Sequence, residues 1–430
     1  MGNPSTEPIA YRRRIVDDDL DALMPGLAAI SIEGPKAVGK TATAITRATT
    51  VYRLDDIGQR QIIQADPERL TRGKPPILVD EWQRWPPSWD VIRRVVDANP
   101  SPGSFLLTGS ASPGGIDTHS GAGRIVPLRM RPMSLAERGF TPSVSLAELL
   151  SGARPGVSGT TPATLDDYVT EILASGFPGM RGLTDRQLRT ALDGYLERVI
   201  DRDFPEQGMT LRRPDTLRAW MRAYAAATST TASFEAIRDA ATPGVGNKPS
   251  ATTTQPWRDI LARLWILDPV PAWIPSSNKL KELASSDKHH LADPALAARL
   301  LQMTPQKLLG GSQPEVAVPR DGTFLGALFE SLIALNLRVY AQAAEADVRH
   351  LRTQRGEREI DFIVIGPDGG IVAIEVKLSA AVGPSDTKHL TWLRQRIGDQ
   401  LLDAVLVTTG TEAYRREDGI AVVPAALLGP

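Results

Sequence analysis

The sequence contains no cysteine, and this absence excludes several kinds of protein at once. Disulfide frameworks, thiolate nucleophiles and cysteine-ligated zinc sites are all impossible. No stretch approaches the roughly 20 apolar residues that a membrane helix needs, so we expect no membrane partner. The start of the chain also lacks the apolar core of a signal peptide. We therefore expect a cytoplasmic protein.

The chain also lacks an excess of either charge, and it has little lysine. It carries 49 basic and 50 acidic residues in 430, for a net charge of −1. Any contact with nucleic acid must therefore come from local patches of charge. Only ten of the basic residues are lysines, so a lysine at a motif position is more informative than usual. The length predicts two or three domains.

A glycine-rich loop follows the short apolar run at residues 28–33. Its sequence, GPKAVGKT, fits the phosphate-binding pattern G-x-x-x-x-G-K-[ST] and opens a predicted helix. Backbone N–H groups in such a loop surround phosphates, and the helix N-terminus adds positive potential. Lys40 would reach the β- and γ-phosphates of ATP, and Thr41 would ligate Mg²⁺. The predicted nucleotide-binding residues are Gly34, Pro35, Lys36, Ala37, Val38, Gly39, Lys40 and Thr41.

A second apolar run, PPILVDEW at residues 75–82, ends in two acids. This order is typical of a Walker B strand. Asp80 would hold Mg²⁺, usually through water, and Glu81 would polarise the water that attacks ATP. The alternative is a strand that ends in two surface acids, but its position downstream of a phosphate-binding loop favours the catalytic interpretation.

A third run, FLLTGSAS at residues 105–112, ends in hydroxyl side chains. Thr108 or Ser110 either senses the γ-phosphate or caps a turn, and the sequence leaves both interpretations open. Arg124 follows a glycine-rich stretch. It is either an arginine finger, acting within its own chain or on a neighbouring subunit, or an ordinary surface residue. Thr108 and Ser110 are therefore added to the nucleotide-binding candidates, and Arg124 joins Glu81 as a catalytic candidate.

The chain divides into three regions by pattern. Residues 1–140 alternate strand-like runs with helical stretches, which predicts a parallel sheet covered by helices. Residues 141–163 are rich in Ser, Pro and Gly and are interpreted as a connection. Residues 164–308 are mostly helical, and three helices followed by an extended segment suggest a winged-helix module. Residues 322–430 contain a long apolar helix, a hairpin, another helix and a strand.

The hairpin at residues 360–377 carries charge inside apolar strands. If it is symmetric about Asp368, Asp361 faces Glu375, with roughly 4.5–5.5 Å between their Cβ atoms. Two like charges that close, in a largely buried sheet, repel and lose solvation. A divalent cation between them would remove both problems. The alternative is a solvated strand end at which Lys377 neutralises one acid.

These pieces, in this order, resemble a family of bacterial and archaeal ATP-binding proteins of the AAA+ type whose C-terminal part is labelled DUF4143. The resemblance covers most of the chain. It rests on GPKAVGKT, LVDEWQRWP, LLTGSAS, GRIVPLRMRPMSLAE, YLERVIDRDF, HHLADPALAARLL, LFESLIALNL and EIDFIVIGPDGGIVAIEVKLS.

The resemblance implies an α/β multidomain protein: an AAA+-like P-loop ATPase, a winged-helix-like middle and a C-terminal domain similar to PD-(D/E)xK restriction endonucleases. Ile360 stands in place of the proline of that motif, and many relatives also lack this proline. The motif implies that the acids hold Mg²⁺ and that Lys377 helps orient or deprotonate water. The implied metal ligands are Glu330, Asp361 and Glu375, and the implied catalytic pair is Glu375 and Lys377.

Two functions remain open at this stage. The first is an ATP-dependent enzyme that binds or cleaves nucleic acid, with DNA favoured, using ATP and Mg²⁺. The second is an ATP-regulated signalling or remodelling protein that acts on a protein partner and uses the nuclease-like domain only for binding. A homo-oligomer is compatible with both.

Overall fold

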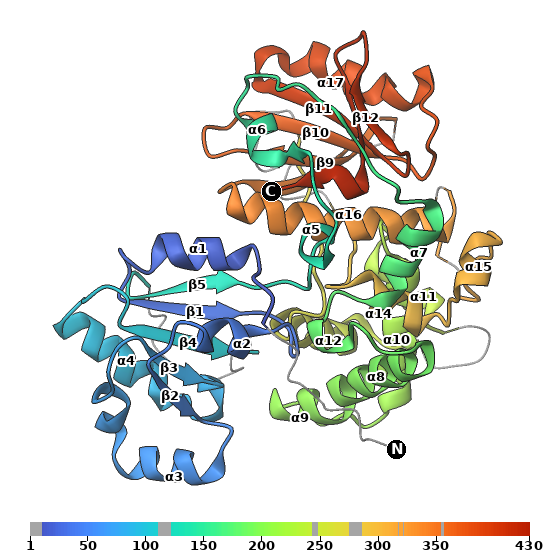
Figure 1. Cartoon of the computed structure of the whole chain (residues 1–430). Helices are drawn as coiled ribbons and strands as arrows, with labels where there is room; N and C mark the ends of the chain where they lie inside the picture. The colour runs from blue at the N-terminus through green and yellow to red at the C-terminus, as the bar shows by residue number, and fades with distance from the viewer. Residues whose placement is uncertain are drawn as a thin grey trace, which may run out of the picture. The chain divides into compact units, whose positions relative to one another are not determined.

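The computed structural model describes residues 11–110, 122–242, 248–274, 286–316, 318–320, 322–353 and 357–430. Its contacts group the chain into two compact units, Met1–Met130 and Arg131–Pro430. The predicted middle and C-terminal regions thus lie together in the second unit. Figure 1 shows the elements of both units, which are described one at a time below.

Five parallel strands form the sheet of the first unit, in the order β2-β3-β4-β1-β5. They are β1 (Ala29–Glu33), β2 (Thr50–Arg53), β3 (Ile77–Asp80), β4 (Phe105–Gly109) and β5 (Ile125–Arg129). The helices are α1 (Val16–Leu23), α2 (Lys40–Ile45), α3 (Ile57–Ala65) and α4 (Pro87–Ala98), with short turns η1 (Pro67–Thr71) and η2 (Trp82–Arg84). The predicted α/β class with a parallel sheet is confirmed here.

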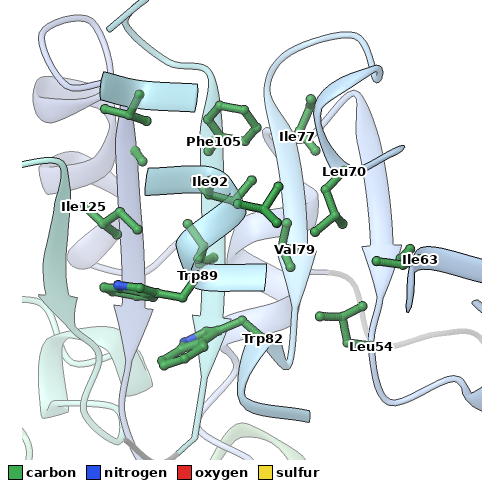
Figure 2. Close-up of a cluster of buried hydrophobic side chains, with 14 residues drawn as sticks. Leu54, Ile63, Leu70, Ile77, Val79, Trp82, Trp89, Ile92, Phe105 and Ile125 are labelled. Carbon is green, nitrogen blue, oxygen red and sulfur yellow. The ribbon is translucent and has the colours of Figure 1, made fainter. Parts of the chain in front are cut away.

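Alternate residues of these strands build one apolar core (Figure 2). Trp82 and Trp89 lie within it, with ring centroids 4.6 Å apart and an interplanar angle of 39°. Burying a large side chain of this kind stabilises a fold by about 2–3 kcal/mol. Because Trp82 directly follows Glu81, its burial also fixes the end of β3, where the acidic pair lies.

The helices of the second unit precede, interrupt and cover its main sheet. They are α5 (Leu135–Arg138), α6 (Leu146–Leu150), α7 (Leu165–Ala174), α8 (Asp185–Arg198), α9 (Phe204–Glu206), α10 (Pro214–Ala226), α11 (Phe234–Ala240), α12 (Ala251–Arg263), α14 (Pro294–Leu300), α15 (Pro305–Leu309), α16 (Phe324–Ala343) and α17 (Lys388–Ile397). After α12, extended residues form antiparallel bridges between Leu267 and Leu291 and between Val270 and Lys288. Three helices followed by an extended pair is the order that the sequence predicts, and the winged-helix interpretation stays a prediction.

The main sheet of this unit has seven strands in the order β7-β12-β13-β11-β10-β9-β8. They are β7 (Gly159–Thr160), β8 (Asp347–Arg352), β9 (Glu359–Ile365), β10 (Ile371–Val376), β11 (Leu401–Thr408), β12 (Glu412–Arg415) and β13 (Ala421–Pro424). Strands β9 and β10 pair as Ile365–Ile371, Val364–Val372, Ile363–Ala373 and Phe362–Ile374, which confirms the predicted hairpin register. The pairing ends there, and beyond it the side chain of Asp361 accepts from the backbone N–H of Val376 at 2.9 Å.

The predicted connection at residues 141–163 is wrong, because this segment forms part of the second unit. Strand β6 (Val144–Ser145) pairs with β14 (Leu428–Gly429), and β7 adds to the edge of the main sheet beside β12. Both partners lie more than two hundred residues away in the sequence. Strands this short, paired at such separation, leave no periodic pattern in the local sequence.

One described helix, α16, is long and apolar enough to cross a membrane by length and composition. Its apolar window is 72% buried inside the structure, and α16 packs against β8 and β9. A helix that is apolar on most sides is expected in the core of a large unit. We therefore assign α16 as a core helix.

Candidate functional site

The glycine-rich loop has the backbone geometry that close approach to phosphate requires. A Cβ atom at Gly34 would lie 2.1 Å from the Met130 carbonyl oxygen, so no other residue fits there. Gly39 has φ +108°, a left-handed conformation that glycine adopts at little cost. Lys40 is buried and donates to the carbonyls of Gly34 and Pro35, each at 2.8 Å. The loop thus curls around the lysine that would meet the phosphates.

Arg14 supports this loop from outside, and the sequence analysis missed it. Its Nη1 atom donates to the carbonyl of Val38 at 3.1 Å, and the side chain is buried. The backbone N–H of Arg14 donates to Asp17 at 2.6 Å. A buried guanidinium on a loop carbonyl restricts the loop and adds positive charge near it. No motif marks this residue, which stands in a run of three arginines.

The two predicted magnesium ligands of the first unit meet in space. Thr41 Oγ1 donates to Asp80 Oδ1 at 2.7 Å, across thirty-nine residues of sequence. Because β4 lies between β1 and β3, Thr108 at its end reaches the same atom and donates to it at 2.5 Å. Thr108 Oγ1 also accepts from the backbone N–H of Glu81 at 3.2 Å. A threonine hydroxyl and a carboxylate are donors that Mg²⁺ prefers, so these residues fit the ion of an ATP complex.

Glu81 is held in place by two neighbours. Its carboxylate accepts from Gln83 Nε2 at 2.7 Å and from Ser110 Oγ at 3.3 Å. Its backbone has φ +54°, which is uncommon for a residue with a side chain and costs of order 1–2 kcal/mol. Such outliers persist where surrounding contacts fix them, and they concentrate at functional sites. Ser110 thus contacts the predicted general base, and its role as a turn cap involves residues after 110 that lie outside the described part of the chain.

Burial sets the electrostatics of this site. Burial lowers the pKa of Lys40 to about 8, although the charges of Glu81 and Asp80 oppose that shift. Burial also raises the pKa of Glu81, and the positive charge of Lys40 opposes this. A general base works best when its pKa lies nearer the operating pH than that of a free carboxylate. The phosphates of a bound nucleotide would add negative charge beside the buried ammonium of Lys40.

Arg124 lies at the other end of the sheet from the glycine-rich loop. Strands β1 and β5 pair from Ala29–Ile125 to Glu33–Arg129, so Arg124 precedes the first pair while the loop follows the last. The five residues of β1 span four rises, so the two ends lie roughly 13 Å apart. Arg124 donates instead to Asp97 at 2.7 Å and is half exposed. This register disfavours an arginine finger that acts within its own chain, and action on a neighbour stays a prediction.

A cavity of about 860 Å³ opens in the second unit and gathers the predicted C-terminal residues. Glu330 enters it from α16, Asp361 from β9, and Glu375 and Lys377 from the end of β10. Basic and hydroxyl-bearing side chains also line the cavity, and they include Arg320, Arg352, Lys388, His389, Thr323 and the run Thr228–Thr231.

Lys288 contacts three carboxylates that line this cavity, and the sequence analysis did not predict it. Its Nζ atom lies 3.0 Å from one oxygen each of Glu330, Glu359 and Asp361. The side chain is 1% exposed. Burial acts to lower its pKa, but the three carboxylates outweigh burial and hold the pKa well above its usual value. Two signals were available: Lys288 is one of ten lysines, and it directly precedes the HHLADP motif.

The remaining acids of the cavity are also strongly perturbed. Burial and the charge of Asp361 raise the pKa of Glu330 to about 8, against the opposing charge of Lys288. Burial and Asp361 likewise raise the pKa of Glu375 to about 8, against Lys377. Lys377 Nζ donates to Glu375 Oε1 at 2.9 Å, as the solvated-end alternative predicts, but Glu375 itself is buried.

The divalent ion predicted at Glu330, Asp361 and Glu375 does not fit this arrangement. Asp361 already accepts from Lys288 through Oδ1, at 3.0 Å, and from the backbone N–H of Val376 through Oδ2, at 2.9 Å. Within the described part of the chain, no group of three or more His, Cys, Asp or Glu side chains is arranged to hold a metal ion. The cation among these carboxylates is an ammonium group.

Three family models match successive parts of the chain. Residues 28–139 match an AAA domain, residues 165–307 match a domain of unknown function (DUF8612), and residues 325–428 match another (DUF4143). Together with the site around Lys40 and Asp80, the first match supports an AAA-type ATP-binding domain joined to a DUF4143 region. Domains of this type use a nucleotide, usually with Mg²⁺.

The chain is also similar to individual proteins. Two of them are the uncharacterized proteins Rv2008c of Mycobacterium tuberculosis and Mb2031c of Mycobacterium bovis. Each is 25% identical over 354 residues, which cover 81% of this chain and 68% of the relative. A solved structure, the Walker-type ATPase PABY2304 of Pyrococcus abyssi, matches with a TM-score of 0.37 and 15% identity. That match covers 69% of this chain and 98% of the other.

Proposed function

We propose that the first unit hydrolyses ATP with Mg²⁺. The observation that supports this most is the hydrogen-bonded set of Thr41, Asp80, Thr108 and Glu81, which joins the start of α2 to the ends of β3 and β4. Two surface acids at a strand end would not require a buried threonine to position both of them. The match to an AAA domain over residues 28–139 supports the same conclusion.

The residues divide the work of hydrolysis. Lys40, released from the loop carbonyls, would contact the β- and γ-phosphates, and Thr41 and Asp80 would hold Mg²⁺. The bound ion would neutralise charge that develops on the transferred phosphoryl group. Glu81 would orient and deprotonate the attacking water, with Ser110 and Gln83 fixing its carboxylate. α2 has only six residues, so the loop amides and Lys40, and not a helix dipole, are expected to supply most of the attraction.

The test compares ATP binding and turnover in three chains. Lys40→Ala should lose most ATP affinity, because it removes the charge that faces the phosphates. Asp80→Asn should lose Mg²⁺-dependent turnover. Lys307→Ala, which changes an exposed lysine of the other unit, is the matched control and should behave as the parent. Parent-like ATP binding by Lys40→Ala in calorimetry would overturn the nucleotide site.

We further propose that the cavity of the second unit binds nucleic acid. The order α16, β8, β9, β10, α17, β11, with β10 parallel to β11, supports the PD-(D/E)xK-like interpretation. Phosphodiester chains are bound by cations and hydroxyl groups, and both line this cavity. Carboxylates line the same cavity, and Lys288 contacts three of them. This arrangement supports binding more than metal-dependent cleavage.

Binding of single-stranded and double-stranded DNA and of RNA can be measured by fluorescence anisotropy at several salt concentrations. Lys377→Ala and Lys388→Ala should each weaken binding and lower the salt slope by roughly one unit. Arg189→Ala on α8, whose exposed side chain is not part of the cavity, is the control. No binding of any nucleic acid would leave a protein partner as the ligand of this domain. Mg²⁺-dependent cleavage would restore the nuclease hypothesis.

A further inference from the structure

The backbone around Lys288 is held on both sides. Lys288 exchanges two hydrogen bonds with Val270, each of 2.9 Å. The next residue, His289, donates to the carbonyl of Thr230 at 2.8 Å and accepts from the N–H of Ser229 at 2.8 Å. Lys288 therefore extends from a fixed strand-like position. Its ammonium reaches the carboxylates because the backbone directs it there.

Every described contact of the ammonium is with a carboxylate. Glu330, Glu359 and Asp361 come from a helix and an adjoining strand and meet at Lys288 Nζ at 3.0 Å each. Glu359 also pairs with Arg352 at 3.3 Å, so its second oxygen is used as well. A buried charge is stable only when it is paired and hydrogen-bonded on all sides. The cluster satisfies this condition for a singly charged cation with three donors.

A carboxylate oxygen next to this cluster has no hydrogen-bond partner among the described residues. Glu375 Oε2 is buried and makes no hydrogen bond, while Oε1 accepts from Lys377. The cavity reaches this carboxylate, so a bound molecule or a proton can approach it. Glu375 and Asp361 are the two acids between which the sequence predicts a shared metal, and only Glu375 retains an unused oxygen.

We propose that the ammonium of Lys288 is the resident cation of this cavity and occupies the position that a divalent metal holds in nuclease-like domains. The carboxylates are then charge-balanced without a metal ion, and the domain has no means of metal-dependent cleavage while Lys288 is in place. This inference concerns the cation alone and does not depend on whether the cavity binds nucleic acid.

The test uses the full chain carrying Asp80→Asn, so that the nucleotide site of the first unit cannot contribute a metal ligand. Free and bound Mn²⁺ are measured by electron paramagnetic resonance, with Mn²⁺ alone as the probe. The proposal predicts no bound Mn²⁺ at millimolar concentration in this parent. Adding Lys288→Met removes the ammonium and keeps an unbranched side chain of similar length. That chain should bind one equivalent of Mn²⁺.

Two further chains locate the gained ion. Adding Asp361→Asn to the Lys288→Met chain should abolish the gained Mn²⁺, which assigns it to this cavity. Lys307→Met, an exposed substitution of the same type, should gain nothing. If Lys288→Met lowers the melting temperature, Mn²⁺ should raise it again in that chain and in neither the parent nor the Asp361→Asn chain, because a bound ion stabilises by mass action.

Two results would overturn the proposal. One is a parent that binds an equivalent of Mn²⁺ which Asp361→Asn removes, because the metal would then bind beside Lys288. This measurement does not require the Lys288→Met chain to fold. The other is a Lys288→Met chain that neither binds Mn²⁺ nor is stabilised by it, because its carboxylates would then not form a cation site at all.

Discussion

Thr108 illustrates how one buried hydroxyl can organise a catalytic site. It is fully buried, donates to Asp80 and accepts from the backbone of Glu81. Its position therefore favours a role in holding the acidic pair over direct sensing of the γ-phosphate. The sequence offered both sensing and turn capping as interpretations.

We predict that Thr108→Val will slow ATP hydrolysis about tenfold, which corresponds to a loss of about 1.4 kcal/mol of positioning. ATP affinity should change little, because Thr108 acts through Asp80 and Glu81. Thr108→Ser retains the hydroxyl and should recover most of the turnover. Steady-state kinetics and calorimetry separate the two effects. A valine variant with normal turnover per bound ATP and weakened affinity would instead identify Thr108 as a γ-phosphate sensor.

His350 on β8 provides a second prediction, which concerns pH. Burial lowers its pKa from 6.5 to about 4, and the charge of Lys288 adds to that shift. The folded state therefore disfavours the protonated ring, so this stability is present above pH 6.5 and is lost as pH falls toward 4. The shift corresponds to about 3 kcal/mol. Urea unfolding should show the parent losing about that much relative to His350→Gln across this range.

Arg189→Gln, which changes an exposed side chain of α8 that does not titrate in this pH range, is the control for this experiment. Comparing the parent with each variant at every pH cancels the titration of the other groups. Parallel stability curves for the parent and His350→Gln would show that His350 titrates alike in the folded and unfolded chains.

Residues within one short motif were predictable, and residues that meet across the fold were not. Lys40, Thr41 and Asp80 follow from strings in which a strand, a loop and a charge occur together. Lys288 meets Asp361 across seventy-three residues, and Arg14 meets Val38 through a loop carbonyl. A single sequence contains no pattern that links such positions, because their proximity depends on how whole elements pack.

At the scale of elements, the order of the strands decides which residues meet at the same end of the sheet. Parallel pairing puts the ends of β1, β3 and β4 together and brings the candidate site into one place. The same pairing puts Arg124 just before β5, at the opposite end of the sheet. Alternation of strands and helices predicted a parallel sheet, but the register that separates Arg124 from the loop came only from the structure. The edge strand β7 likewise follows from pairing that no local pattern reveals.

We predict that Arg124→Ala will leave ATP turnover unchanged in dilute protein, because its own loop lies out of reach. If Arg124 completes the site of a neighbouring copy, turnover per chain in the parent should rise with protein concentration, and the variant should lack that rise. Asp97→Asn, which removes the partner of Arg124, is the matched control. Reduced turnover in a dilute, monomeric Arg124→Ala sample would contradict the register argument.

At the scale of the whole molecule, the chain combines an AAA-type unit with a larger unit that contains the cavity lined by Glu330, Asp361 and Glu375. Two ligands that bind one chain can influence each other only through a difference in free energy, and that influence is reciprocal for binding. If the chain couples its two binding sites, ATP bound to the first unit should change the affinity of the second unit for nucleic acid, and nucleic acid should change the affinity for ATP by the same factor. The ATP site is the premise of this coupling, so its chemistry is the central claim.

The most direct test of that claim is single-turnover hydrolysis by Glu81→Gln beside calorimetry of ATP binding to the same sample. Glutamine keeps the size of the side chain and its contacts with Gln83 and Ser110 but cannot accept a proton from water. We predict ATP binding within about twofold of the parent and hydrolysis slower by at least about a hundredfold, the usual contribution of a general base. Hydrolysis at the parental rate would contradict the assignment of Glu81 as the general base, because Glu81 would then be a positioned acid with no part in the reaction.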